Sequence, residues 1–226
     1  LVNRRIVLEY LGHKVEHLDT AMSNQSGRFR FKVKDGKPGI YRLDIAGTLY
    51  LYLVLHPGER FSFSTSLSSF WRTMKCRGSK STVQYFKLEK ENDALRLKQE
   101  ELRTILQQQW DTTSLENLNR FITTKDILKV IRKEQEVLFP DFIRNNPSSL
   151  VALMLFDQFG FTGDGSLITL VDSALQHSYP GYSYVRDFHE RSAGLNATRK
   201  GAIMPDLIPE DPADSTIHFS DLKGKV

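Results

Sequence analysis

The sequence predicts an α+β protein in which an antiparallel β-sandwich or barrel, residues 1–78, precedes a helical domain, residues 79–194. Three observations support this division. Apolar and polar residues alternate in short runs up to Gly78, as they do in half-buried strands. Beyond it, apolar residues recur at intervals of three and four, which is typical of helices packed on one side. After Gly194 the periodicity fades, so residues 195–226 are expected to be a linker and the truncated start of a further domain.

The stretch from Gly27 to Ser66 is expected to form four short strands joined by turns. Residues 27–33 alternate basic and apolar side chains, which would place Phe29, Phe31 and Val33 on one face of a strand. Glycine and proline mark the following turns, because they supply the backbone angles that turns need. The other three strands are expected at residues 41–45, 49–55 and 60–64. This spacing is typical of an antiparallel meander in a sandwich or barrel.

Further strands are expected on both sides of this meander. Two precede it, at Arg5–Tyr10 and Lys14–Met22, with Gly12 at the turn between them. One follows, at Thr73–Arg77, and brings the expected number to six or seven strands by Gly78.

The helical part begins with a long helix that Ser79 or Ser81 can cap and that runs to about Gln109. The polar residues Asn92 and Gln99 interrupt its apolar seam, so we expect a helix that is packed on one side and partly exposed to water along that seam. Packing on the next helix of the same chain is favoured, and a dimeric coiled coil stays open as an alternative. The seam comprises Tyr85, Leu88, Asn92, Leu95, Gln99, Leu102 and Leu106.

Five more helical segments are expected. The first is a short piece at Leu115–Phe121, and a separate helix starts at Thr124 or Asp126. Asn145–Ser149 contains a proline that stops this helix and serines that cap the next. The remaining helices are a buried one at Leu150–Phe159, another at Ser166–His177, and a last one after Tyr182 that runs to about Arg191.

Composition narrows the class of protein. The chain has 31 basic and 27 acidic residues, and the net charge of +4 is too evenly mixed to indicate a polyanionic partner. It has no apolar run of roughly 18 residues, the length at which a membrane-spanning helix is considered. Since the chain begins at Leu1 without methionine, it is interpreted as a processed or engineered fragment.

The sequence predicts no catalytic, cofactor-binding or metal-ligating residue. Cys76 is the single cysteine, which excludes an internal disulfide and a cysteine-based metal site. Its alternation with Met74 favours a buried strand thiol over a nucleophile. Gly160–Gly165 is glycine-rich but lacks the lysine of a phosphate-binding loop, so it is read as a connection between helices. The histidines are scattered: His13 and His17 could share a strand face, His56 lies in a turn, and His177 and His189 lie near helix ends.

Four basic residues, Arg28, Arg30, Lys32 and Lys34, alternate with the aromatic pair Phe29 and Phe31. A basic and aromatic sheet can bind single-stranded nucleic acid when both kinds of side chain share a face. Here the cations and the rings point opposite ways. We therefore interpret the segment as solvated chain over a core, and no nucleic-acid partner is expected.

The end of the chain resembles the opening of a thioredoxin-like domain. Residues 201–206, Gly-Ala-Ile-Met-Pro-Asp, are followed at residues 217–225 by Ile-His-Phe-Ser-Asp-Leu-Lys-Gly-Lys. These are similar to the start of domains of the peroxiredoxin and TlpA/ResA type, although Met204 and Leu207 depart from the usual Ala-Pro-Asp-Phe. In that family a Trp-Cys-x-x-Cys motif follows one strand and a loop later, with a nucleophilic first cysteine and a resolving second one. This chain stops before that motif.

The β region resembles an N-terminal domain of unknown function in envelope thiol-disulfide oxidoreductases of Bacteroidetes. The matching features of the β region are short: Asp19-Thr20, Gly27-x-Phe29-x-Phe31, Pro38-Gly39-x-Tyr41-x-Leu43 and Pro57-Gly58-Glu59. As in that family, a Gly-Ser (Gly78-Ser79) leads into the helical part and a Pro-Ser-Ser (Pro147-Ser148-Ser149) follows late in it.

The resemblance implies a non-catalytic region of a periplasmic or envelope oxidoreductase, which positions the redox domain or recruits a partner. A protein thiol or disulfide substrate would act through the missing domain. A homodimer and a lipid anchor upstream of Leu1 stay open, and no cofactor is expected.

A second hypothesis is a stand-alone β-sandwich module that binds a ligand or another protein without a redox role. Exposed aromatic side chains would then form its platform, whereas core packing would leave only a scaffold. The candidate residues are Tyr50, Tyr52, Phe70, Trp71, Tyr179, Tyr182 and Tyr184.

Overall fold

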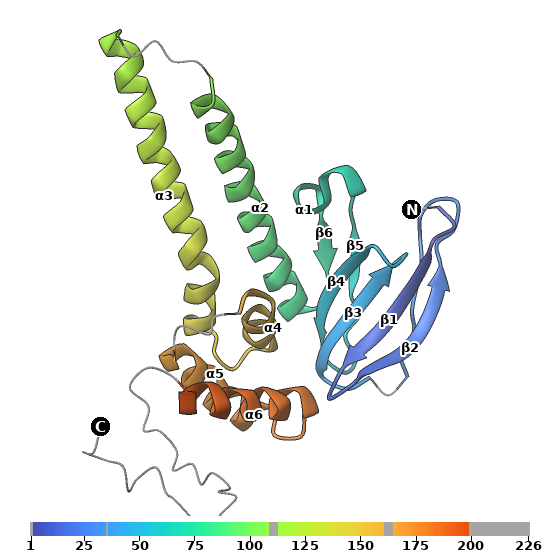
Figure 1. The fold of residues 1–226 in the computed structure, drawn as a ribbon. Coiled ribbons are helices and arrows are strands. Elements are labelled where there is room, and N and C mark those ends of the chain that lie inside the picture. The colour runs from blue at the N-terminus through green and yellow to red at the C-terminus, as the bar shows by residue number, and fades with distance from the viewer. Residues whose placement is uncertain (1, 35, 109–112, 161–164, 199–226) are drawn as a thin grey trace, which may run out of the picture.

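The computed structural model describes residues 2–34, 36–108, 113–160 and 165–198, and these form an α+β fold (Figure 1). Four strands make one antiparallel sheet in the order β2-β1-β3-β4. Each of β2 and β4 pairs with a single neighbour, so in the described chain this sheet is open and does not close into a barrel. The strands are β1 Arg5–Leu11, β2 Val15–Met22, β3 Gly39–Ile45 and β4 Leu49–Leu55.

A smaller antiparallel sheet pairs β5 (Ser62–Ser64) with β6 (Lys75–Arg77). The 3₁₀ helix η1 (Leu67–Ser69) and the short helix α1 (Phe70–Thr73) connect them. The predicted α+β class and the antiparallel pairing are confirmed.

The predicted strand at residues 27–33 is wrong, because the described chain there pairs with no strand. The predicted alternation of burial is nevertheless present: Phe29 and Phe31 are half-buried, and Arg30 and Lys32 are exposed. The Phe29 ring lies 6.0 Å from the ring of Phe63 in β5. Burial of the apolar side chains thus accounts for the alternation without backbone pairing.

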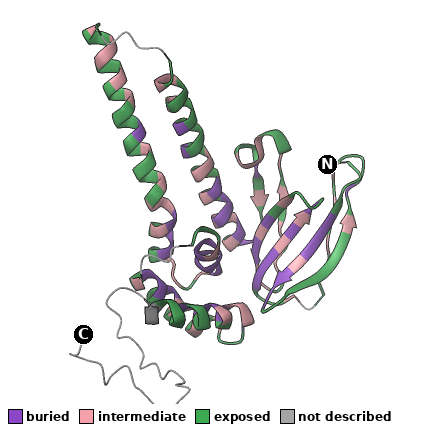
Figure 2. Ribbon diagram, in the orientation of Figure 1, coloured by how far each residue is buried: buried purple, intermediate pink, exposed green. Residues whose placement is uncertain are grey.

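The two edges of the main sheet differ. Strand β2 is exposed along nearly its whole length (Figure 2), and its register with β1 shifts between Leu8 and Glu9. At the other edge, hydroxyl groups from the start of α2 bond to the backbone of β4. Val54 donates its N–H to Thr82 Oγ1 at 2.9 Å, and its carbonyl accepts from Ser79 Oγ at 2.8 Å and Thr82 Oγ1 at 2.7 Å.

Five longer helices follow: α2 Lys80–Leu106, α3 Leu115–Asn145, α4 Leu150–Phe159, α5 Gly165–Ser178 and α6 Ser183–Thr198. Helices α2 and α3 form an antiparallel hairpin whose far end projects away from the other elements (Figure 1). The predicted packing of the α2 seam on the next helix is therefore correct. None of the described helices combines the length and the apolar character needed to cross a bilayer.

The prediction of two separate helices within residues 115–145 is wrong, since α3 is continuous. The capping signals at Thr124 and Asp126 favoured a break, but Thr124 Oγ1 donates instead to the carbonyl of Arg120 within the helix, at 2.8 Å. Leu128 stays on the buried side of α3 beyond that point. Packing on α2 outweighs the local preference for a new start.

Helix α4 occupies the centre of the molecule. Its first seven residues, Leu150–Phe156, are all buried, and it contacts β3, α2, α3 and α5. Near it, the Tyr182 hydroxyl at the start of α6 donates to the carbonyl of Leu11 at 2.5 Å and accepts from the N–H of Ile40 at 3.0 Å. The last strand ends at Arg77 and the first of the five longer helices begins at Lys80, but one hydrophobic core runs through both parts.

Candidate functional site

Cys76 lies on β6 opposite Phe63 and is half-buried. Burial raises the pKa of its thiol, and the nearby Lys87 ammonium opposes this only in part. A raised pKa leaves less thiolate, the form that attacks disulfides. The position therefore fits a packing role.

Three histidines of the described chain, His13, His17 and His189, do not converge. His13 Nδ1 lies 3.0 Å from Asp187 of α6, His189 Nδ1 lies 2.9 Å from Asp172 of α5, and His17 bonds to Thr20. Each thus has a separate partner. Within the described part of the chain, no three His, Cys, Asp or Glu side chains gather as a metal site would require.

The aromatic residues of the second hypothesis do not form a shared exposed platform. Tyr182 is buried, and Tyr50 is the most exposed of the set, with 49% of its surface accessible. The Arg42 guanidinium lies over the Tyr50 ring, 4.9 Å from its centre. The others are half-buried against the core: Tyr52, Phe70, Trp71, Tyr179 and Tyr184.

A chain of polar side chains runs along the seam between α2 and α3. Gln135 of α3 donates to Asn92 Oδ1 at 2.7 Å and accepts from Gln99 Nε2 at 2.6 Å. Glu89 continues this chain toward the sheet, because it bonds to both Asn92 and Tyr85. Asn92 and Gln99, the two polar residues expected to interrupt the apolar seam of α2, are therefore hydrogen-bonded to α3 across that seam. The signal that sequence reasoning missed is Gln135, which stands four residues after Ile131 and three before Leu138 on the same side of α3.

Glu89 is the one charged side chain that is buried in the described part of the chain, with 8% of its surface exposed. Burial raises the pKa of its carboxyl, while hydrogen bonds from Tyr85 and Asn92 act in the opposite direction. Gln158 of α4 also bonds to Tyr85. The polar chain thereby links the base of the hairpin to the central helix.

Replacing Glu89 by glutamine is expected to change how stability depends on pH. Because the folded state holds the Glu89 proton more tightly than the unfolded state, the free energy of unfolding falls as pH rises from the ordinary value of 4.5 through the raised folded pKa. Glu89→Gln stays neutral and should lack this loss, so its advantage over the parent chain should be larger at neutral pH than near pH 4.5. Urea unfolding across a pH series measures it. The exposed Glu91→Gln is the control, and parallel curves for Glu89→Gln and the parent would contradict the assignment.

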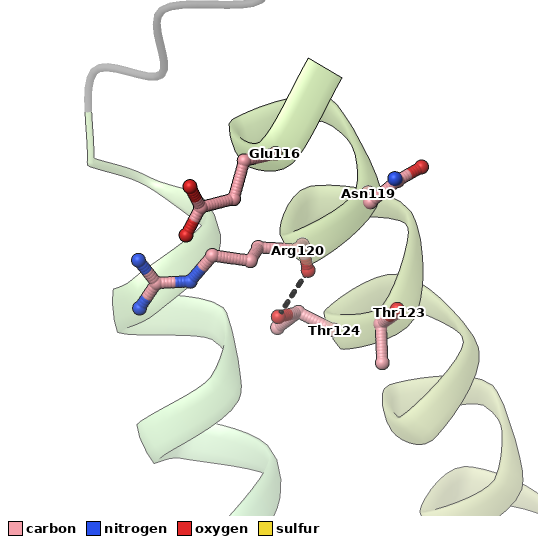
Figure 3. A pocket seen from close by; sticks show the side chains of 5 residues that line it. All are labelled: Glu116, Asn119, Arg120, Thr123 and Thr124. Atoms are coloured by element: carbon pink, nitrogen blue, oxygen red, sulfur yellow. Dashed lines mark hydrogen bonds between the residues drawn. The ribbon is translucent and has the colours of Figure 1, made fainter. Parts of the chain in front are cut away.

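The outer surface of the hairpin carries apolar side chains that no described element covers. The most exposed are Leu115 at 73%, Val130 at 58% and Ile122 at 48%. Near the tip, five α3 residues line a shallow depression of about 330 Å³ (Figure 3). Among the described residues the lining of this depression comes from α3 alone: Glu116, Asn119, Arg120, Thr123 and Thr124. This surface can contact a partner but does not resemble a catalytic centre.

Comparison of the chain with protein-family models, curated proteins and solved structures finds no match.

Proposed function

We propose that this chain is the non-catalytic region of a thiol-disulfide oxidoreductase of the cell envelope, and that it recruits a partner or positions the redox domain. The support from sequence is the resemblance of residues 201–225 to the start of a thioredoxin-like domain, which lies outside the described residues. In the structure Cys76 is half-buried and its pKa is raised, which makes it a poor redox nucleophile, so the proposal assigns the redox chemistry to residues other than Cys76.

The observation that carries a recruiting role is the α2–α3 hairpin. It projects from the body, and Leu115, Ile122 and Val130 expose apolar surface along it. Exposed apolar side chains grouped on one element are typical of surfaces that contact another protein. Hydrogen bonds through Glu89 and Gln135 join the side chains of α2 and α3 in the seam of the hairpin. These bonds hold the two helices together, so the hairpin can present a rigid surface to a partner.

The test uses the full-length native chain, with its gene read beyond Val226 for a Cys-x-x-Cys motif. We expect reduction of a protein disulfide that is unchanged by Cys76→Ser. We expect the double variant Ile122→Ser/Val130→Ser to lower the rate on a protein substrate about tenfold, as loss of one or two interface contacts would, while a small-molecule disulfide is reduced at the parent rate. Loss of turnover in Cys76→Ser, or a native chain without the motif, would reject the redox role and leave a binding module.

A further inference from the structure

Basic residues are concentrated in two stretches of this chain. Residues 20–34 and 60–88 together hold ten of the 31 basic residues and none of the 27 acidic ones. The remaining positions hold 21 basic and 27 acidic residues, so they are net negative. The overall net charge of +4, which argued against a polyanionic partner, is therefore the sum of two strongly basic stretches and a net acidic remainder.

The fold places the two stretches side by side. Phe29 and Phe63 pack together with ring centres 6.0 Å apart, which brings the extended segment 28–34 against β5. Phe63 and its partner Cys76 on β6 are half-buried, whereas the neighbouring Lys75 and Arg77 are exposed. On the segment and on the small sheet alike, the exposed cations therefore lie on the side turned away from the side chains that pack toward the core. We call this surface the basic face: Arg28, Arg30, Lys32, Lys34, Lys75 and Arg77.

A depression of about 480 Å³ adjoins the basic face next to α1. Three cations line it, Arg72, Lys75 and Lys90, and Lys90 comes from α2. The other lining residues are Ser64, Thr65, Ser66, Thr73 and Met74, so no carboxylate is among them. Guanidinium and ammonium groups are donors that suit the oxygens of a phosphate group.

These cations have no counter-charge in the described part of the chain, where none of the ten basic residues in the two stretches forms an ion pair. Elsewhere in the described chain some arginines are paired, for example Arg42 with Glu9 at 2.6 Å and Arg191 with Asp157 at 2.9 Å. A field of one sign attracts ligands of the opposite sign.

An exposed apolar residue beside the depression distinguishes a lipid surface from other anions. Leu67 in η1 directly follows Ser66, which lines the depression, and is 53% exposed. Nucleic acid binding would instead use exposed rings for stacking, but Phe29 and Phe31 pack toward the core. We propose that the basic face docks on an anionic lipid surface, with a headgroup phosphate held by Arg72, Lys75 and Lys90, and with Leu67 entering the interface.

Co-sedimentation of the 226-residue chain with vesicles tests this docking. We expect binding to phosphatidylcholine vesicles that contain phosphatidylglycerol, weakening steeply as salt is added, and little binding to phosphatidylcholine alone. The triple variant Arg30→Gln/Lys32→Gln/Arg77→Gln should weaken binding by about a hundredfold, since each basic residue near such a surface contributes about fivefold. Leu67→Ser should weaken it by several-fold without changing the charge.

The matched control is Lys98→Gln/Arg132→Gln/Arg186→Gln, which removes the same charge from exposed residues elsewhere. It should bind nearly as the parent does. Circular dichroism confirms that each variant is folded, and the salt titration of the parent chain stands even if one is not. The proposal is overturned by no binding to anionic vesicles, by equal binding to neutral ones, by equal losses in both triple variants, or by tighter binding to single-stranded DNA or a sulfated polysaccharide.

Discussion

Replacing Gly78 by alanine is expected to lower the free energy of unfolding by about 3 kcal/mol or more. Gly78 has φ of 109°, which side chains rarely adopt, and an added Cβ would lie 1.8 Å from the carbonyl oxygen of Arg60. The backbone would have to shift between β6 and α2. That shift would disturb Ser79, whose hydroxyl bonds to Val54 of the sheet. Urea unfolding followed by circular dichroism measures the change.

Substitutions at two other glycines separate the effect of the positive φ from the effect of the close contact. Gly160→Ala has a positive φ of 59° but no atom within 4 Å of its Cβ, so it should cost only about 1 kcal/mol. Gly181→Ala has neither feature and should change stability by less than about 0.5 kcal/mol. If Gly78→Ala costs no more than Gly160→Ala, the close approach to Arg60 is relieved without strain.

Shortening Leu153 to alanine is expected to cost about 2–5 kcal/mol, because it opens a cavity at the centre of the core. Leu153 is fully buried in α4, which contacts both the sheet and the other helices. The loss should therefore lower the stability of strands and helices together. Leu97→Ala, 40% exposed on α2, is the control and should change stability by less than about 0.5 kcal/mol.

Two probes follow this unfolding. Circular dichroism reports the helices, and the fluorescence of Trp71, whose ring centre lies 5.5 Å from that of Phe86, reports the packing of α1 on α2. Replacing Trp110 by phenylalanine leaves Trp71 as the single tryptophan. Coincident transitions are expected from the continuous core. Two separated transitions would instead make residues 1–78 and 79–194 independent folding units.

Sequence patterns located most helices and strands because those patterns depend on local burial. The run Leu49–Leu55 coincides with β4, and Ser79 and Ser149 accept hydrogen bonds at the starts of α2 and α4. Alternation at residues 28–33 indicated the buried side correctly but could not show that the backbone lacks a pairing strand. Continuity of α3 through Thr124 depended on contacts with α2, which are remote in sequence.

Little of the candidate sites could be predicted from the sequence, because each is made by residues far apart in the chain. Asn92 and Gln99 were recognised as polar interruptions, but their common partner Gln135 lies on another helix. Lys90 joins Arg72 at one depression only after α2 folds against α1. The net charge of the whole chain conceals this grouping of cations, whereas the absence of Asp and Glu from residues 20–34 and 60–88 reveals it.

The hydroxyl groups of Ser79 and Thr82 block one edge of the main sheet, so a further strand can be added at the other edge. A strand added beside β4 would have to displace both side chains from Val54, whereas addition beside β2 displaces no described residue. Unprotected strand edges on both sides are what allow sheets to extend into fibrils. Here two chains that pair through β2 would each use their accessible edge, and the assembly would terminate at two copies.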